Sequence, residues 1–386
     1  MLEGGSIICF AHDWGGDPTS KTHIMRILSR KNRVLWINSI AMRRPTASRA
    51  DLGRLASKLR RGLGGCREVE PNIFVVNPLV VPLPGVAAAD RLNAVILAGT
   101  LRRLSRRLAL KQPILWSFLP TVGRLLGRLD EGMVIYHCVD EYAEFSGVPK
   151  QALLSMERDL VHRADLVLTS SERLCEERRP GNPNTHFIPH GVDVDHFAQS
   201  LNPATIVPED LRRLPRPIVG FIGLLADWVD LDLLRAVALA RPAWSFALIG
   251  RSVTDLAAVQ NLPNVHLLGQ KPFSALPAYC RGIDVGIIPF RINRLTLRAN
   301  PLKLREYLAA GLPVVSTPLP EVARFAPLLH LADGPAAFLA GIESALEDVG
   351  DEAARGRRAL SMTAEGWEAR VEEISRLIRD RAEAAA

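Results

Sequence analysis

Short apolar runs alternate with amphipathic stretches through the first half of the chain. Consecutive apolar residues are typical of strands buried on both faces of a parallel sheet, and apolar positions three or four apart are typical of covering helices. This half therefore predicts a parallel sheet wrapped by helices. The expected strands span 6–11, 34–37, 73–76, 114–117, 134–137 and 166–169, and the expected helices span 20–30, 88–110 and 151–162.

The same alternation restarts after a break that is rich in proline. Pro203, Pro208, Pro215 and Pro217 cluster with charged residues, which predicts a linker at 202–216. Further strands are expected at 218–222, 246–249, 265–268, 285–289 and 314–316, and a last helical pattern follows Thr363. The predicted fold class is α/β, with two doubly wound, Rossmann-like domains facing each other across a cleft. The expected parts are a domain at 1–201, the linker at 202–216, a domain at 217–362 and a helix at 363–386.

This architecture already favours some classes of protein over others. In doubly wound domains, ligands bind outside the carboxyl ends of the strands, so two such domains can hold two substrates. A transferase, or an isomerase of a bound ligand, fits better than a simple hydrolase. A Rossmann dehydrogenase does not fit, because no GxGxxG follows the first strand of either half.

The cysteine content and the first residues bear on the cellular compartment of the protein. The five cysteines of the 386 residues are scattered and form no CxxC pair, which argues against a disulfide framework and a zinc site. The first residues lack the basic start and apolar core of a signal peptide, and no apolar run has the length of a membrane span. We expect a cytoplasmic protein that neither crosses the membrane nor is exported by that route.

The net charge of +7 is concentrated in two basic segments. Segment 43–67 holds eight Lys and Arg and one acid, and a second cluster comprises Arg102, Arg103, Arg106, Arg107 and Lys111. No nucleic-acid motif accompanies them, so nucleic acid is not an expected partner. Leucines recur at helical spacing in segment 43–67. Two interpretations stay open: a helix on an anionic membrane surface, which would make the protein peripheral on the inner face, or a solvated basic helix whose leucines face the core.

The sequence NPLKLREYLAAGLPVVST, at 300–317, predicts an anion site at the start of a helix. Asn300 is expected to cap the helix and Pro301 to occupy its first position. Free backbone N–H groups and the helix dipole would bind phosphate there, and Lys303 would add a positive charge. Glu306, about one turn further, could accept both hydroxyls of a ribose. Together these features describe a nucleoside diphosphate site, with an ordinary Lys–Glu pair as the alternative.

Two polar segments end strands in the first half. FAHDWGGDPTS, at 10–20, brings His12 and Asp13 to a strand end, and Gly15 and Gly16 would allow close approach to a ligand. The alternative is that His12 and Asp13 cap the next helix, although Thr19 or Ser20 is a better cap. IYHCVDEY, at 135–142, ends another strand and contains His137 and Asp140. Asp140 is our candidate for a general base or orienting group near the reacting centre, with a helix-capping role as the alternative.

Five motifs follow one another in a specific order. They are HFIPHGVDVDHF, VGFIGLL, NVHLLGQKP, AYCRGIDVGIIPF and NPLKLREYLAAGLPVVST. In this set the chain resembles the GT-B glycosyltransferases of the retaining family 4 type, strongly over 185–317 and more weakly before that. DVD, at 193–195, is similar to the metal-binding DxD of another glycosyltransferase fold, but it lies outside the context that motif requires.

The resemblance implies a nucleotide-sugar donor bound mainly by the C-terminal domain. Gly223 and Leu224 would lie near the pyrophosphate, and the segment 266–270, beginning with His266, near the base. Pro301, Leu302 and Lys303 would contact the sugar or phosphate and Glu306 the ribose. The acceptor would bind over the N-terminal domain, where His137 and Asp140 match acceptor-side and sugar-contacting positions, and the last helix would cross back to that domain. No cofactor or metal is implied beyond the donor.

The chain departs from this family at two places. The family often has two glutamates separated by seven residues; Glu306 matches the second, and Arg298 stands at the first. The family also often has an Arg and a Lys after the first strand of this domain, where the chain reads GLLADWVDLDLL. Arg251 could supply that charge, and Asn300 the missing sugar contact.

We therefore expect a hexosyltransferase that retains configuration. It would move a sugar from a nucleoside diphosphate sugar to a lipid-linked or saccharide acceptor in cell-envelope polysaccharide or glycolipid synthesis. Two alternatives remain at this stage: a nucleotide-sugar 2-epimerase of the same fold, and a catalytically silent nucleotide-sugar-binding protein.

Overall fold

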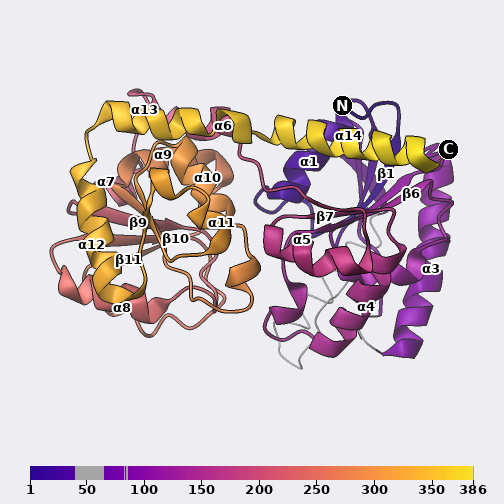
Figure 1. The fold of residues 1–386 in the computed structure, drawn as a ribbon, viewed down its shortest axis with the longest axis horizontal. Coiled ribbons are helices and arrows are strands. Elements are labelled where there is room, and N and C mark those ends of the chain that lie inside the picture. The colour runs from indigo at the N-terminus through magenta and orange to yellow at the C-terminus, as the bar shows by residue number, and fades with distance from the viewer. Residues whose placement is uncertain (40–64, 82, 84–85, 386) are drawn as a thin grey trace. The chain divides into compact units, whose positions relative to one another are not determined.

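The computed structural model describes residues 1–39, 65–81, 83 and 86–385, which form two compact units. The first unit comprises Met1–Pro189 and Arg370–Ala386, and the second comprises His190–Ala369. Each unit is built on one sheet flanked by helices (Figure 1). Most of the basic segment 43–67 lies outside the described residues.

The first unit contains an eight-stranded sheet of order β3-β4-β2-β1-β5-β6-β7-β8. All neighbouring strands are parallel except β3, which runs antiparallel to β4. Strands β6 and β7 are wholly buried and β1 is buried except at Ser6, as their apolar runs predict. The elements are β1 (Ser6–Phe10), α1 (Ser20–Ser29), β2 (Arg33–Ile37), β3 (Cys66–Glu70), β4 (Ile73–Val76), α3 (Ala87–Arg107), β5 (Ile114–Ser117), β6 (Met133–Cys138), α4 (Lys150–Arg163), β7 (Leu166–Thr169), α5 (Glu172–Arg178) and β8 (Thr185–Phe187), with short 3-10 helices at Pro120–Leu125 and Tyr142–Glu144.

The second unit contains a six-stranded parallel sheet of order β11-β10-β9-β12-β13-β14. Its core is formed by the buried strands β9, β10 and β12 and by the apolar faces of the helices around them. The elements are α6 (Val194–Ala198), α7 (Glu209–Arg212), β9 (Ile218–Ile222), α8 (Leu231–Ala240), β10 (Ser245–Ile249), β11 (Val265–Gly269), α9 (Leu276–Gly282), β12 (Val285–Ile288), α10 (Leu302–Ala309), β13 (Val314–Ser316), α11 (Pro320–Ala323), β14 (His330–Leu331), α12 (Gly334–Glu347), α13 (Glu352–Ser361) and α14 (Trp367–Ala385), with short 3-10 helices at Gln199–Leu201, Phe273–Ala275, Thr296–Arg298 and Thr363–Glu365.

The chain passes from the first unit to the second between Pro189 and His190, upstream of the linker expected at 202–216. The residues after this point pack within the second unit: the Ser200 hydroxyl donates to the Ala310 carbonyl over 2.7 Å, and Arg281 donates to the Ser200 carbonyl. The division therefore comes before the proline cluster, because the helices at 194–201 are anchored on the second unit.

The last helix begins in the second unit and ends in the first. Residues 370–385 of α14 belong to the first unit, and Val371 and Ile374 are fully buried. The amino terminus forms an ion pair with Glu372 at 2.6 Å, and Arg381 donates to the Asp165 carbonyl over 3.2 Å. Among the helices that the structure describes, none has both the length and the apolar character that a membrane span requires.

Candidate functional site

Tyr307 fixes helix α10 against the sheet of the second unit. Its hydroxyl accepts a 2.6 Å hydrogen bond from the backbone N–H of Ile222, the last residue of β9. Its ring lies over Gly286 of β12, where an added Cβ would come within 2.8 Å of the ring. These contacts hold the start of α10 at the carboxyl edge of the sheet, which is where doubly wound folds bind ligands.

The start of α10 differs from the prediction in one detail. Pro301 is the N-cap residue, the helix begins at Leu302, and no side chain caps it. The expectation that Asn300 caps the helix is wrong, because its Oδ1 accepts instead from the guanidinium of buried Arg305 at 2.7 Å. Arg305 is in turn held by Glu365 at 3.0 Å. The helix N-terminus thus keeps backbone N–H groups without a side-chain acceptor, as an anion site requires.

Lys303 extends from this first turn between two aromatic rings. Its Nζ lies 5.2 Å from the ring centroid of Phe221 and 4.5 Å from that of Phe290. Burial lowers the pKa of Lys303 to about 8, although the carboxylate of Glu306 opposes that shift. Aromatic faces stabilise an ammonium only in part. The position therefore favours a stronger counter-charge such as phosphate.

Glu306 lies one turn further along the same helix. Burial raises its pKa to about 7, and Lys303 opposes the shift. Within the described residues, neither Lys303 nor Glu306 forms an ion pair. Both polar groups are therefore desolvated without a strong partner, an arrangement that is common at binding sites.

Two glycine turns lie next to Lys303. Gly223 follows β9 with φ of +146°, and Gly250 follows β10 with φ of +152°. A Cβ on Gly250 would lie 1.8 Å from the Gly223 carbonyl oxygen, and a Cβ on Gly223 would lie 3.0 Å from Lys303 Cε. Only glycine allows the two turns and the lysine to approach this closely. Leu224 follows in the same turn and is partly buried.

The other predicted donor-side residues are less closely gathered. Arg251 directly follows Gly250 and is exposed, and its carbonyl accepts from the N–H of Leu225 at 3.0 Å. His266 lies near the amino end of β11, so within 266–270 it is Gln270 that follows the carboxyl end of that strand. Arg298 is buried and donates to the Arg294 carbonyl at 2.8 Å. The roles predicted for these side chains stay predictions.

The first unit gathers four polar side chains at the carboxyl ends of β1 and β6. His12 follows β1, His137 belongs to β6, and Asp140 follows β6. The fourth is Lys21 in the first turn of α1, whose Nζ lies 2.8 Å from His12 Nδ1. Lys21 is 6% exposed, and burial lowers its pKa to about 8 while Asp140 opposes that shift. Burial raises the pKa of Asp140 to about 6, and Lys21 opposes it.

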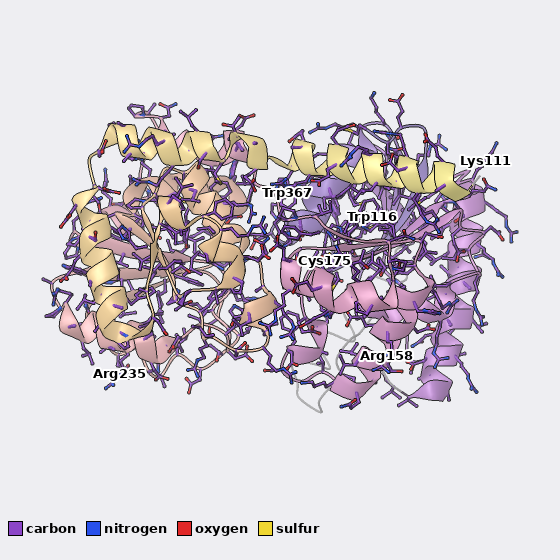
Figure 2. All side chains as sticks on the ribbon, in the orientation of Figure 1. Lys111, Trp116, Arg158, Cys175, Arg235 and Trp367 are labelled. Atoms are coloured by element: carbon purple, nitrogen blue, oxygen red, sulfur yellow. The ribbon has the colours of Figure 1, made fainter. Side chains whose placement is uncertain are left out.

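Three buried polar atoms, one in this cluster and two near it, have no hydrogen-bond partner among the described residues. They are Nε1 of Trp116, Nδ1 of His137 and the hydroxyl of Tyr142. Figure 2 places the labelled Trp116 inside the first unit. The His137 ring stacks on Phe118 at 4.9 Å, and burial lowers the pKa of His137 to about 3. Buried polar atoms normally have partners, so this group is suited to contact the hydroxyls of a ligand.

The remaining residues of the glycine loop have local roles. Asp13 accepts from the backbone N–H of Ser39 at 3.0 Å, and Gly15 has φ of +96° with no atom within 4 Å of an added Cβ. A Cβ added to Gly16 would meet the Asp13 carbonyl oxygen at 4.0 Å, an ordinary contact. Thr19, one of the two expected caps, is the N-cap residue of α1.

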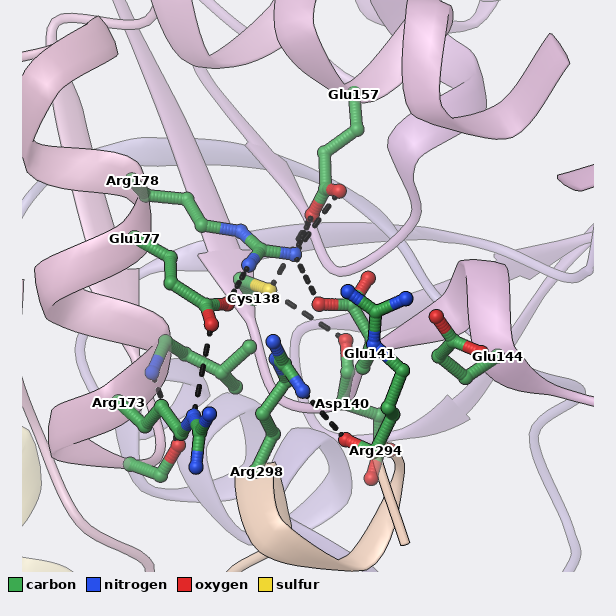
Figure 3. Close-up of polar contacts among 12 residues, drawn as sticks. Cys138, Asp140, Glu141, Glu144, Glu157, Arg173, Glu177, Arg178, Arg294 and Arg298 are labelled. Atoms are coloured by element: carbon green, nitrogen blue, oxygen red, sulfur yellow. Dashed lines mark hydrogen bonds and ion pairs between the residues drawn. The ribbon is translucent and has the colours of Figure 1, made fainter. Parts of the chain in front are cut away.

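A buried ionic network supports the loop that carries Asp140. Arg178 donates to Glu141 at 2.9 Å and to Glu157 at 3.0 Å (Figure 3). Glu157 also accepts from the hydroxyl of Tyr136. The Cys138 thiol lies between Glu157 and the Asp140 carbonyl, 3.5 Å from each. Because Arg178 donates to two carboxylates at once, it links α5, α4 and the loop after β6, and so fixes the path of the chain from β6 into this loop.

Sequence reasoning missed Lys21, Gly250 and Tyr142. A lysine in the first turn of a helix opposes the helix dipole, and this was the available signal for Lys21. Gly250 follows a strand in the same way as Gly223 and could have been found by that parallel.

Asp193 of the DVD segment caps α6 through its Oδ1, 3.1 Å from the backbone nitrogen of His196. In the part of the chain that the structure describes, no group of three or more His, Cys, Asp or Glu could hold a metal ion.

The chain is similar to known glycosyltransferases. Residues 216–348 match the family model of the group 1 glycosyl transferases. The chain is 29% identical to the "Putative teichuronic acid biosynthesis glycosyltransferase TuaH" of Bacillus subtilis, over 66% of this chain and 68% of the relative. It is 30% identical to a GDP-mannose-dependent alpha-mannosyltransferase of Mycolicibacterium smegmatis, over 44% of each chain.

Solved structures show the same fold. The sucrose-phosphate synthase of Thermosynechococcus elongatus superposes with a TM-score of 0.72 at 16% identity, covering 99% of this chain and all of the other. HepE of Anabaena, solved in complex with UDP, gives a TM-score of 0.61 at 15% identity, covering 97% of this chain and all of the other. Residues 216–348 therefore carry the sequence features of the group 1 glycosyl transferases, and the chain as a whole has the GT-B fold.

Proposed function

We propose that the protein transfers a hexose, with retention, from a nucleoside diphosphate sugar to a lipid-linked or saccharide acceptor of the cell envelope. The observation that carries this proposal is the uncapped start of α10, where Lys303 and Glu306 lie one turn apart beside the turns of Gly223 and Gly250. The helix start and Lys303 suit a diphosphate, and Glu306 suits its ribose. The glycines leave room for the pyrophosphate to approach the backbone.

The donor side would act mainly through charge. Lys303 and the helix N–H groups would stabilise the negative charge that develops on the leaving phosphate, and Glu306 would hold the ribose. Pro301 and Leu302 would contact the sugar or phosphate, and Asn300 is already oriented by Arg305. The mannosyltransferase relative is named for GDP-mannose, and HepE was solved with UDP and with UDP-glucose. These names support a nucleotide sugar as donor without deciding its base.

The acceptor side would use the cluster of the first unit. The unpartnered atoms of Trp116, His137 and Tyr142 suit sugar hydroxyls, and Asp140 would orient the acceptor. In retaining transfer on one face of the sugar, the leaving phosphate can itself take the acceptor proton. A dedicated base is then not required, and the proposal includes no metal ion or bound cofactor.

The setting follows from the relatives and from the charge of the chain. The Bacillus relative is named for teichuronic acid, a cell-envelope polymer. Basic residues 102, 103, 106 and 107 are close together in sequence at the end of α3, next to Lys111. Basic surfaces of this kind attract anionic lipids, which would bring the enzyme to the cytoplasmic membrane face where lipid-linked acceptors lie.

A donor screen tests the proposal. The purified protein is mixed with UDP-, GDP-, ADP- and dTDP-sugars, and thermal stability and nucleotide release are measured with and without anionic vesicles that carry a bacterial lipid extract. We expect one nucleotide class to raise the melting temperature and its release to increase with the lipid extract. A shift without release under any condition would instead indicate the silent binding protein. Conversion of the donor into its 2-epimer would indicate the epimerase. No shift with any nucleotide would refute the assignment of α10.

A further inference from the structure

The bond between Lys21 and His12 determines which nitrogen of the histidine carries a proton. Lys21 Nζ lies 2.8 Å from His12 Nδ1. A lysine ammonium has three donors and no acceptor, so Nδ1 must accept. A neutral imidazole that accepts at one nitrogen carries its proton on the other. The remaining nitrogen of His12, Nε2, is therefore an N–H donor.

The surroundings of His12 hold the ring in place and leave it accessible. The His12 carbonyl accepts from Nε1 of Trp36 at 3.0 Å, and the N–H of Trp14 donates to Asn38 at 2.8 Å. These bonds fix the loop directly after the histidine. His12 itself is exposed, whereas Lys21 beneath it is buried. A ligand can thus reach the histidine but not the ammonium.

We propose that Lys21 is a positioning residue that fixes His12 as an Nε2–H donor toward a substrate oxygen, so that His12 does not serve as the general base. The proposal rests on the glycosyl transfer proposed above. It also identifies a role for a lysine that contacts no substrate itself.

The charges around Lys21 keep this arrangement intact near neutral pH. Three groups face it besides His12: Asp140 and His137 from the end of β6, and Cys9 from β1. Asp140 stabilises the ammonium, while burial raises the pKa of Cys9 and lowers that of His137, so both stay neutral. Desolvation and the neighbouring ammonium also lower the pKa of His12. Above pH about 8, where Lys21 loses its proton, the restraint on the tautomer should relax.

Nitrogen-15 NMR of the full chain tests the tautomer without any substrate. Long-range proton–nitrogen spectra of labelled protein report which ring nitrogen is protonated, and the His12 signals are assigned by their loss in His12→Gln. We expect a neutral ring with its proton on Nε2 from pH 6.5 to 7.5. In Lys21→Met we expect mixed tautomers and a pKa that rises toward the ordinary histidine value of about 6.5. Lys31→Met serves as the matched control, because Lys31 is exposed and pairs with Glu3.

A proton on Nδ1, a doubly protonated ring at neutral pH, or no change in Lys21→Met would overturn the proposal. If Lys21→Met does not fold, the titration of the wild-type protein still decides the tautomer. This readout needs no turnover, so it remains decisive even if no donor is ever found.

Kinetics distinguish a donor from a base. Glutamine places an amide N–H close to the position of Nε2, whereas alanine leaves nothing there. We expect His12→Ala to lower kcat about 100-fold and His12→Gln to retain activity within about tenfold of wild type, as for loss of one stabilising donor. Equal loss in both variants, together with loss of an acidic limb from the pH profile of kcat, would show that His12 acts as a base.

Discussion

Lys303 and Glu306 should make the affinity for a nucleotide sugar depend on pH in both directions. Burial lowers the pKa of Lys303 to about 8 and raises that of Glu306 to about 7. The ammonium that attracts phosphate is therefore lost as the pH rises through 8. The carboxylate that accepts the ribose hydroxyls is lost as the pH falls through 7. Binding to the free protein should be tightest between these two values.

The change in apparent Kd follows from the fraction of the protein in which each side chain carries its charge. Between pH 8 and 9 the protonated fraction of Lys303 falls from about one half to about one tenth, so the apparent Kd should rise about fivefold. Between pH 7 and 6 the ionised fraction of Glu306 falls in the same proportion, with a second rise of about fivefold. A nucleotide sugar is the correct probe, because its diphosphate has no terminal monoester group to titrate near pH 6.

Isothermal titration calorimetry from pH 5.5 to 9.5 measures both limbs. In Lys303→Arg the alkaline limb should vanish, since a guanidinium stays protonated throughout this range. In Glu306→Gln the acidic limb should vanish. Lys271→Met is the matched control, because Lys271 lies in the same unit but is paired with Asp210 at 2.6 Å. A Kd that is constant from pH 7 to 9, or an alkaline limb that persists in Lys303→Arg, would refute the reasoning.

Three further predictions concern stability. Glu306→Gln should raise the free energy of unfolding by about 1–2 kcal/mol at pH 8 and leave it unchanged at pH 4. The raised carboxyl pKa makes the folded state lose stability as the pH rises from about 4.5 through 7, and glutamine removes that loss. Chemical denaturation at both pH values checks this. Gly250→Ala should lower the free energy of unfolding by about 3 kcal/mol, since it combines positive φ with the 1.8 Å contact. Gly356→Ala, in open space within α13, should instead raise it by about 0.5–1 kcal/mol. Denaturant titration measures both, and equal effects would contradict the argument. Arg178→Met should lower the free energy of unfolding by about 3–5 kcal/mol, and by less at acidic pH, because it removes the guanidinium that two buried carboxylates share. The exposed Arg173→Met should lower it by under about 1 kcal/mol in the same assay, and a similar small effect of both would show that the network contributes little.

The strands were predictable because their physical signal is local. A strand buried on both faces of a parallel sheet needs consecutive apolar residues, and five predicted strands have the observed bounds, at 73–76, 114–117, 166–169, 218–222 and 314–316. Strand β3 was missed because CREVE is a charged antiparallel edge without an apolar run. Strand β14 was missed because it has only two residues.

The details of the site depend on contacts that are remote in sequence. Asn300 has the right chemistry for a cap, but a buried arginine five residues later takes its oxygen. Lys21 and Asp140 are far apart in the chain and meet only because β1 and β6 end at the same edge of one sheet. The choice of Lys303 and Glu306 needed only helical spacing. The two rings around Lys303 could not be foreseen, because Phe221 belongs to β9 and Phe290 follows β12.

The most direct test of the central claim is sugar transfer itself. The nucleotide sugar identified by the donor screen is supplied with an isotopic label in its sugar, together with vesicles of bacterial lipid extract, and labelled products are analysed by NMR for the configuration of the new anomeric bond. We predict labelled glycolipid whose anomeric configuration matches that of the donor, and transfer reduced at least tenfold in Lys303→Met, as expected for loss of a charged phosphate contact. Product of inverted configuration, or undiminished transfer by Lys303→Met, would contradict the account.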